Sequence, residues 1–325
     1  MYCRTHGVEA VLKGPQATDG RLQVFAQQRS YLVALAYRML GDLGRAEDMV
    51  QEAWLRWQGA AEVEVESPRA YLVTIVTRLC LHELDSARSR KEESRSDRLP
   101  EPVDIEASGL GSVERIECVS MAFGVVLQRL SATERAVLLL HDVFDLEHEE
   151  IARMLEKSAP ACRKLLERAR RHVRDARRML ETSPDEHRRL LQAFVGAVMV
   201  GDTKQLVSLL TDDAVIVSDG GAGGRAIAGF RNLKKPLAGA AHVAAFVVAA
   251  TQRGAPILQW EERELNGQPA VVFYEGDQPS AALLLGVADG KIQRVFFHAD
   301  MRRLGHLGAR RATTVGAKAW DERTS

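Results

Sequence analysis

The sequence is poor in cysteine, and its few cysteines lie far apart. Among 325 residues only Cys3, Cys80, Cys118 and Cys162 occur, and no two of them form a CxxC pair. This spacing argues against a zinc site and against a disulfide framework. We therefore expect no metal and no disulfides, and a reducing cytoplasm is the compartment that fits.

Long apolar runs are also missing. The sequence has no run of about 18 apolar residues, the length that a transmembrane helix needs. Its first residues lack the basic, apolar and small-residue series of a secretory signal. These two absences predict a soluble protein with no membrane partner and no export.

An excess of one charge is missing as well, but the charges are unevenly placed. Lysine plus arginine and aspartate plus glutamate number 44 each, so net charge alone does not indicate nucleic acid. The stretch Gly41 to Ser67 holds seven acidic and two basic residues, whereas Arg163 to Arg178 holds eight basic and two acidic. One chain therefore offers an acidic face and a basic helix.

The apolar pattern divides the chain into a helical half and a mixed half. From Arg21 to Leu180 apolar residues recur at helical spacing, whereas segments after Ala214 read as strands with turns at Asn266-Gly267 and Asp289-Gly290. The fold class is thus multidomain, with two all-α modules before an α+β domain. The expected boundaries are a flexible N-terminus at 1–20, a helical domain at 21–96, a proline-bearing linker at 97–117, a helix-turn-helix domain at 118–180, the α+β domain at 185–307 and a flexible tail at 308–325.

A helix-turn-helix is predicted in the second module. Ser131 and Glu134 form a capping box before the helical stretch 134–144, and a second helix follows over 149–156. Ser158 is a suitable N-cap for a third helix, because Pro160 is tolerated in a first turn. Two helices, a tight turn and a third helix make up the motif.

The third helix is predicted to bind DNA through its outward face. Cys162, Leu166, Ala169 and Val173 share one face by spacing, which leaves the basic side chains outside. Arginine and lysine at the start of such a helix donate to guanine, and those further along reach phosphates. The alternative is a solvated basic face on a helical bundle. The predicted DNA-binding residues are Ser158, Arg163, Lys164, Glu167, Arg168 and Arg171.

The first module carries acidic and amide side chains on one helix. After a break at Gly41-Asp42, the segment AEDMVQEAWLRW places its polar residues on one side. Together with the preceding YRMLGD, it resembles conserved region two of the extracytoplasmic-function sigma factors. The resemblance implies docking on the clamp helices of the largest subunit of core RNA polymerase through Asp48, Gln51, Glu52 and Leu55. The alternative for this motif alone is an ordinary solvated acidic helix.

The next helix, beginning at Ser67-Pro68, resembles that family's element for opening the minus-ten promoter region. The resemblance assigns DNA contacts to Arg78, His82, Arg88 and Arg90, and base capture to the loop 58–66. That loop is acidic here and Asp85 stands where relatives often carry a basic residue, so promoter sequence does not follow from it. Both modules and their linker resemble the family over about half the chain, which implies binding of promoter DNA and of core polymerase, including its flap.

The α+β domain resembles a cone-shaped SnoaL-like, or nuclear-transport-factor-like, fold. A subgroup of these sigma factors is similar in carrying such a domain, with an LPEP linker motif and an SDGGG motif. Here Ala222 interrupts the glycine run, and 298–301 only loosely match an NPDK element. The resemblance implies that the domain folds back on the sigma modules and regulates them in place of a separate anti-sigma protein. The predicted interdomain residues are Leu99, Pro100, Glu101, Pro102, Asp219, Gly220, Gly221 and Asp300.

Two other functions remain open from the sequence. SnoaL itself is a polyketide cyclase that uses a carboxylate as acid and base, and Asp212, Asp213, Asp219 and His298 are the candidates for such a role. Asp212 and Asp213 are expected to end a helix, so we predict no enzyme and no cofactor. An apolar pocket near Trp260 and Phe273 would suit an unknown small ligand. The rival function is therefore a helix-turn-helix transcriptional regulator with a small-molecule-sensing domain.

Overall fold

The computed structural model describes residues 15–60, 65, 67–89, 98–105, 120–178, 182–220, 233, 235–254 and 259–310. Its first module is a bundle of three helices. Asp42 caps the second helix by accepting from the Arg45 amide, and the Ser67 hydroxyl accepts from the Ala70 amide at the start of the third. The first helix begins earlier than the boundary expected at residue 21. The helices are α1 (Pro15–Leu40), α2 (Leu43–Gly59) and α3 (Pro68–Ser89).

The second module contains the predicted helix-turn-helix. The capping box of Ser131 and Glu134 is present, and the third helix covers 159–178 as expected. The first helix of the motif, predicted over 134–144, differs from the prediction. After Leu138 it widens into a π-helical turn, in which the Phe144 amide donates to the Leu139 carbonyl. The elements are α4 (Met121–Arg129), α5 (Ala132–Leu138), η2 (Leu139–Val143), α6 (His148–Leu155) and α7 (Ala159–Arg178).

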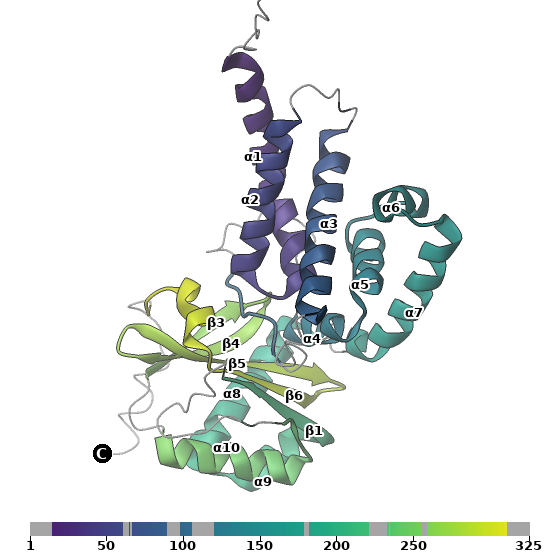
Figure 1. Cartoon of the computed structure of the whole chain (residues 1–325). Coiled ribbons are helices and arrows are strands. Elements are labelled where there is room, and N and C mark those ends of the chain that lie inside the picture. The colour runs from purple at the N-terminus through teal and green to yellow at the C-terminus, as the bar shows by residue number, and fades with distance from the viewer. Residues whose placement is uncertain are drawn as a thin grey trace, which may run out of the picture.

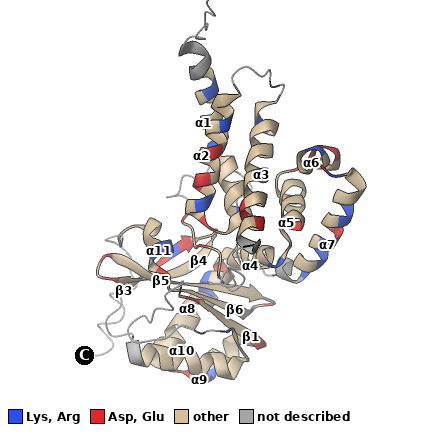
Figure 2. Ribbon diagram, in the orientation of Figure 1, with Lys and Arg blue, Asp and Glu red and all other residues tan. Residues whose placement is uncertain are grey.

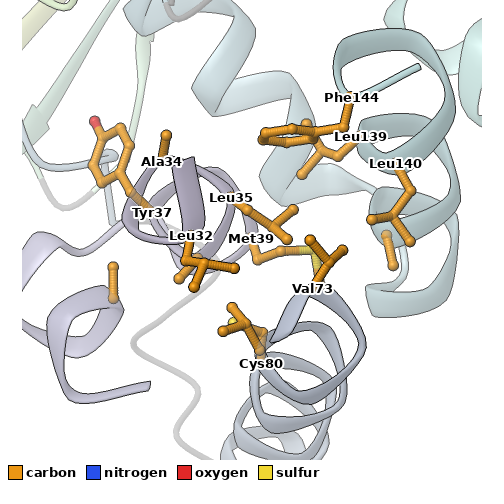
Figure 3. Packing of buried hydrophobic residues seen from close by; sticks show 14 of the residues in the cluster. Leu32, Ala34, Leu35, Tyr37, Met39, Val73, Cys80, Leu139, Leu140 and Phe144 are labelled. Atoms are coloured by element: carbon orange, nitrogen blue, oxygen red, sulfur yellow. The ribbon is translucent and has the colours of Figure 1, made fainter. Parts of the chain in front are cut away.

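The two helical modules share one apolar core. Figure 3 shows Leu139, Leu140 and Phe144 of the second module beside Leu35 and Met39 of the first. The ring of Tyr31 meets that of Phe144 edge-on, with centroids 4.7 Å apart. The modules are therefore packed together rather than held apart by their linker.

The C-terminal domain is a six-stranded sheet with its longer helices on one face (Figure 1). The strand order is β2-β1-β6-β5-β4-β3, and β1 pairs with β6 in parallel whereas the other neighbours are antiparallel. Asp212 and Asp213 lie within β1, so the prediction that they end a helix was wrong. The elements are α8 (Pro184–Val200), α9 (Thr203–Leu209), β1 (Leu210–Asp219), β2 (Leu237–Ala238), α10 (Ala240–Gly254), β3 (Gln259–Leu265), β4 (Gln268–Glu275), β5 (Gln278–Ala288), β6 (Lys291–His298), α11 (Met301–Leu304) and η4 (Gly305–Leu307).

The predicted hairpin turns are confirmed. Asn266 and Gly267 have φ of 54° and 66°, and Asp289 and Gly290 have φ of 51° and 71°. Paired positive φ values at two central residues match the right-handed twist of the flanking strands. The turns fix the register of β3 with β4 and of β5 with β6.

Each face of the sheet is buried against a different part of the molecule. Because side chains alternate along a strand, Val271 and Leu285 face the domain's own helices, whereas Val272 and Leu284 face the other way. That second face is covered by Leu99 of the linker, by Met121 and Ala122 of α4, and by Leu304 and Leu307. The sheet thus packs directly on the helical modules. Over the described residues, no helix is long and apolar enough to span a membrane.

Candidate functional sites

The outward face of α2 is free of contacts with the C-terminal domain among the hydrogen bonds and ion pairs of the described residues. Asp48 and Gln51 are exposed, and Leu55 is an exposed apolar side chain at 55%. Glu52 is half exposed and pairs with Arg56 one turn later, at 2.9 Å. Meanwhile Ala46, Val50 and Ala53 bury the opposite face. The structure therefore brings the four predicted polymerase residues together on one exposed surface.

The outward face of α7 is likewise open. Cys162, Leu166, Ala169 and Val173 are buried, as predicted, and Figure 2 shows that lysine and arginine residues recur along α7. Arg163 pairs with Glu149 at 3.1 Å and Arg168 with Glu134 at 3.1 Å. The Arg163–Glu149 pair is exposed on both sides, and such pairs contribute little stability, so the Arg163 guanidinium is available to exchange partners. Arg168 is also exposed, but its partner Glu134 is largely buried. Ser158, Lys164, Glu167 and Arg171 are exposed.

The predicted minus-ten residues are not all free. Arg78 on α3 donates from Nε to the Met154 carbonyl at 3.0 Å, and its Nη2 lies 2.9 Å from a Glu156 carboxylate oxygen. His82, one turn further along α3, is exposed. The side chain of Arg88, the residue Arg90 and most of the predicted base-capturing loop lie outside what the structure describes. Arg78 thus contacts the second module, while about half of its side chain (48%) stays exposed.

The predicted interdomain motifs meet. The Leu99 amide donates to Asp219 Oδ2 at 3.0 Å, and the same carboxylate oxygen accepts from Arg303 Nη1 at 2.9 Å. Arg303 also donates from Nη2 to the Gly41 carbonyl at 3.0 Å. Residues 99–104 are buried between the C-terminal domain and the first module, rather than forming an exposed spacer.

Glu101 is the centre of the contact with the first module. Its amide donates to the Gly41 carbonyl at 2.9 Å, and its Oε2 accepts from the Leu43 amide at 2.6 Å. The Tyr37 hydroxyl donates to the Glu101 carbonyl at 2.5 Å. Burial raises the pKa of Tyr37 well above its usual value, so this hydroxyl keeps its proton and stays a donor.

Two histidines of the C-terminal domain bind the linker backbone. His306 reaches a Glu101 carboxylate oxygen with Nδ1 at 3.0 Å and the Pro102 carbonyl with Nε2 at 2.8 Å. His298 donates from Nε2 to the Pro100 carbonyl at 2.6 Å. Burial, and next the charge of Arg303, lower the pKa of His298 well below its usual value, so this imidazole is neutral.

Val103 and Asp104 of the linker are held by β3 and the turn that follows it. The Val103 amide donates to Asn266 Oδ1 at 3.1 Å, and the Val103 carbonyl accepts from the Asn266 amide at 2.8 Å. Asp104 forms a buried ion pair with Arg263. Buried polar groups need hydrogen-bond partners. The linker can therefore be buried only because the first module and the C-terminal domain supply these partners.

Pro100 makes a tight contact with α4. A Cβ on Gly124 would lie 2.9 Å from Pro100 Cγ and 3.2 Å from its Cβ. Glycine lowers helix stability, so its presence here is explained by the close approach of the proline ring. The linker therefore touches both helical modules as well as the sheet.

For the remaining predicted regulatory residues, Asp300, Gly220 and Gly221, the structure gives no hydrogen bond to the linker among the residues it describes. Asp300 caps α11 by accepting from the Arg302 amide at 3.2 Å, and it makes no hydrogen bond to the linker among those the structure describes. Gly220 follows β1 directly, and Gly221 lies outside the described residues. Their roles in regulation stay predictions.

The candidate catalytic and pocket residues divide between the two sides of the sheet. Trp260 pairs in register with Phe273 and both pack, half-buried, against the apolar cluster under α8 and α10. Asp219 and His298 are instead occupied by the linker. The acids Asp212 and Asp213 are exposed. Asp219 and His298 are register partners on β1 and β6, and both of their side chains bind the linker backbone, at the Leu99 amide and the Pro100 carbonyl.

Several contact residues were missed in the sequence. Arg263 had one available signal, since the alternation in QWEEREL puts it on the same strand face as buried Leu265. Asn266 was recognised only as a turn residue, although its side chain also binds Val103. Arg303 and His306 lie in a short helical segment without a recognisable motif.

The comparisons with known proteins agree with this organisation. The chain matches Sigma-70 region 2 over residues 24–90 and Sigma-70, region 4, over residues 120–173. Two similar proteins of Mycobacterium tuberculosis are the probable ECF RNA polymerase sigma factor SigI and the ECF RNA polymerase sigma factor SigJ. SigI is 32% identical over 82% of this chain and 89% of its own length, and SigJ is 35% identical over 82% and 88%.

A solved structure extends the likeness to the whole architecture. The crystal structure of Mycobacterium tuberculosis SigJ matches with a TM-score of 0.68 and 28% identity, and the match covers 88% of this chain and 98% of that one. The shared region includes both helical modules and the α+β domain that follows them. The chain therefore belongs to the extracytoplasmic-function RNA polymerase sigma factors and carries a SnoaL-like C-terminal domain.

Proposed function

We propose that the C-terminal domain regulates this sigma factor by binding the linker that connects the two helical modules. As a sigma factor, the chain binds core RNA polymerase and directs promoter recognition. The observation that carries the regulatory proposal is the binding of one short segment, 99–104, by both the first module and the C-terminal domain. A change at the sheet is thereby transmitted to Gly41 and Leu43, at the start of α2.

Core polymerase docks on the outward face of α2, at the clamp helices of the largest subunit. Asp48, Gln51 and Glu52 supply acidic and amide acceptors, and Leu55 adds an exposed apolar contact. Charge complementarity of this kind provides orientation and association rate. The second module engages the flap and reads the minus-35 element, and α3 contributes Arg78, His82, Arg88 and Arg90 to minus-ten contacts.

The minus-35 contact divides between bases and phosphates. Arg163 and Lys164 at the start of α7 are placed for base edges, with Ser158 and Glu167 beside them, while Arg168 and Arg171 lie further along for phosphates. The open outward face of α7 supports this assignment. A small ligand in the cone near Trp260 stays a prediction.

Transcript initiation with purified core polymerase tests the assignment of α2. The double substitution Asp48→Lys and Glu52→Lys reverses the charge of the docking face without touching its buried side. We expect at least about a tenfold loss of initiation, which equals about 1.4 kcal/mol. The control Glu275→Lys reverses one exposed charge on the β4–β5 hairpin and leaves initiation unchanged. Normal initiation by the double variant would contradict the docking site.

A further inference from the structure

The outward side of α7 carries a carboxylate between two basic side chains. Glu167 follows Lys164 by three positions and precedes Arg171 by four, and all three residues are exposed. The buried residues Leu166 and Ala169 lie on the opposite side of the helix. Side chains three and four positions apart are neighbours on a helix, with about 5 to 6 Å between their Cβ atoms. Lys164, Glu167 and Arg171 therefore form one row along the outward side.

Among the described residues, Glu167 differs from the carboxylates around α7 because no cation pairs with it. Three carboxylates from the preceding elements of the module pair with arginines of α7, and these pairs are Glu134 with Arg168, Asp142 with Arg170, and Glu149 with Arg163. The Glu167 side chain takes part in none of the hydrogen bonds and ion pairs of the described residues. A helix that enters the major groove through this row presents the Glu167 carboxylate to the DNA.

The chemistry of a carboxylate restricts what Glu167 can bind there. DNA phosphates are anionic and repel it, and an ionised carboxylate has no hydrogen to donate. In the major groove, cytosine presents the N4 amino group, a donor, whereas adenine presents an N7 acceptor beside its N6 amino group. The lone pair of N7 repels the carboxylate, and guanine presents two acceptors that do the same. Cytosine is therefore the base that suits Glu167.

Lys164 has the complementary chemistry. An ammonium group donates to the O6 and N7 acceptors of guanine. Lys164 and Glu167 thus place a donor and an acceptor one helical turn apart, and a G·C pair presents an acceptor edge and a donor edge in the major groove. The row matches a minus-35 element that contains G·C pairs.

We propose that Glu167 is a specificity-determining residue, which accepts a hydrogen bond from the N4 amino group of a cytosine at one position of the minus-35 element. At that position the carboxylate also acts against the other three bases, because none offers it a donor without a neighbouring acceptor or methyl group. The inference rests on the proposed placement of α7 in the major groove. It gives Glu167 a role in selecting the promoter sequence, in contrast to the phosphate contact of Arg171.

A promoter library tests this role with the full chain and core polymerase. The library is built from a promoter that the chain uses in the initiation assay, with the minus-35 element randomised, and the templates that yield transcripts are sequenced. The wild type should favour cytosine at one position by about tenfold over the other bases. Glu167→Gln should move that preference to adenine, since an amide accepts from N6 and donates to N7. Glu167→Ala should remove the preference at that position.

Two control variants separate selection from affinity and from folding. Arg171→Ala removes a proposed phosphate contact, so it should lower initiation from all templates alike and keep the cytosine preference. Glu275→Gln removes an exposed carboxylate on the β4–β5 hairpin and should change neither the rate nor the preference. A move from cytosine to adenine needs a folded and active chain, so misfolding does not imitate it.

The possible failures are distinguishable. If the wild type and both Glu167 variants select the same bases while Arg171→Ala lowers initiation, the role of Glu167 is overturned and the proposed function stands. A Glu167-dependent preference for a base other than cytosine would overturn it as well. If the wild type shows no preference within the minus-35 element and Arg171→Ala has no effect, the proposed placement of α7 is rejected, and the role of Glu167 with it.

Discussion

The carboxylate of Asp219 accepts a hydrogen bond from the amide of Leu99, 120 positions earlier in the chain. Asp219 ends β1 in the C-terminal domain, and Leu99 begins the LPEP segment. Arg303 binds the same carboxylate oxygen and continues to the Gly41 carbonyl in front of α2. A single buried acid therefore connects the sheet, the linker and the first module.

Removing this acid should destabilise the chain strongly. Asp219→Ala leaves the largely buried guanidinium of Arg303 and the Leu99 amide without their acceptor. Breaking a buried ion pair costs about 3 kcal/mol of unfolding free energy. Asp219→Asn keeps one acceptor and should cost about 1 kcal/mol. Chemical denaturation measures both, and Asp212→Asn, an exposed change on the same strand, is the control. Equal stability of all three variants would exclude the buried contact.

Gly124→Ala should lower stability, although alanine is the better helix former. The added methyl group would lie within 3.2 Å of two Pro100 side-chain atoms, so the linker must move away from α4. We expect a loss of about 1 kcal/mol, as is usual for overpacking. Gly196→Ala, where a Cβ meets nothing within 4 Å, should instead gain a fraction of that amount. A gain at both positions would show that Pro100 does not press on α4.

Stability should fall between neutral pH and pH 5 because of buried neutral histidines. Burial lowers the pKa of His187 from 6.5 to about 4 and that of His298 well below 6.5. Below pH 6.5 the unfolded chain therefore binds protons that the folded chain does not, so acid favours unfolding. His187 alone accounts for about 2 kcal/mol between pH 6.5 and pH 5. In denaturation experiments across this range, the unfolding free energy of His187→Gln should fall less steeply with decreasing pH than that of the wild type. An equal slope would contradict the lowered pKa of His187.

Replacing His306 should weaken the hold of the C-terminal domain on the linker. Its two ring nitrogens face a Glu101 carboxylate oxygen and the Pro102 carbonyl. His306→Gln should lose about 1 to 2 kcal/mol of stability, because one amide side chain cannot replace both contacts. Chemical denaturation measures the loss, and unchanged stability would contradict a structural role for these two contacts.

The sequence predicted the elements of this molecule better than their contacts. Local signals sufficed for the helix-turn-helix, because the capping box of Ser131 and Glu134 and the apolar face of α7 depend on neighbours within a few residues. The same holds for Asn266-Gly267, whose turn requires positive φ. The acidic helix was also placed correctly, since its buried and exposed positions follow the helical period.

The family resemblance predicted only some of the residues that make contacts between domains. The LPEP residues and Asp219 were predicted as interdomain residues from the resemblance, but their partners Arg303 and His306 carry no local pattern that distinguishes them from surface residues. Arg78 was predicted to contact DNA from the resemblance, and this stays a prediction. No local pattern indicates that its side chain also contacts the end of α6. The Asp212-Asp213 pair resembled a helix end, yet both residues lie in β1, at the irregularity between the positions Leu210 and Val215 that pair with β6. Tertiary pairing of this kind is absent from local periodicity.

The most direct test of regulation through the linker is transcript initiation by purified core polymerase with the full chain and its Asp219→Asn variant. Asparagine preserves the shape of the side chain but weakens its hold on Leu99 and Arg303. We predict that the variant initiates at a rate at least about threefold different from that of the wild type, corresponding to about 0.7 kcal/mol, while Asp212→Asn matches the wild type. Equal initiation by all three proteins at every promoter tested would contradict the account.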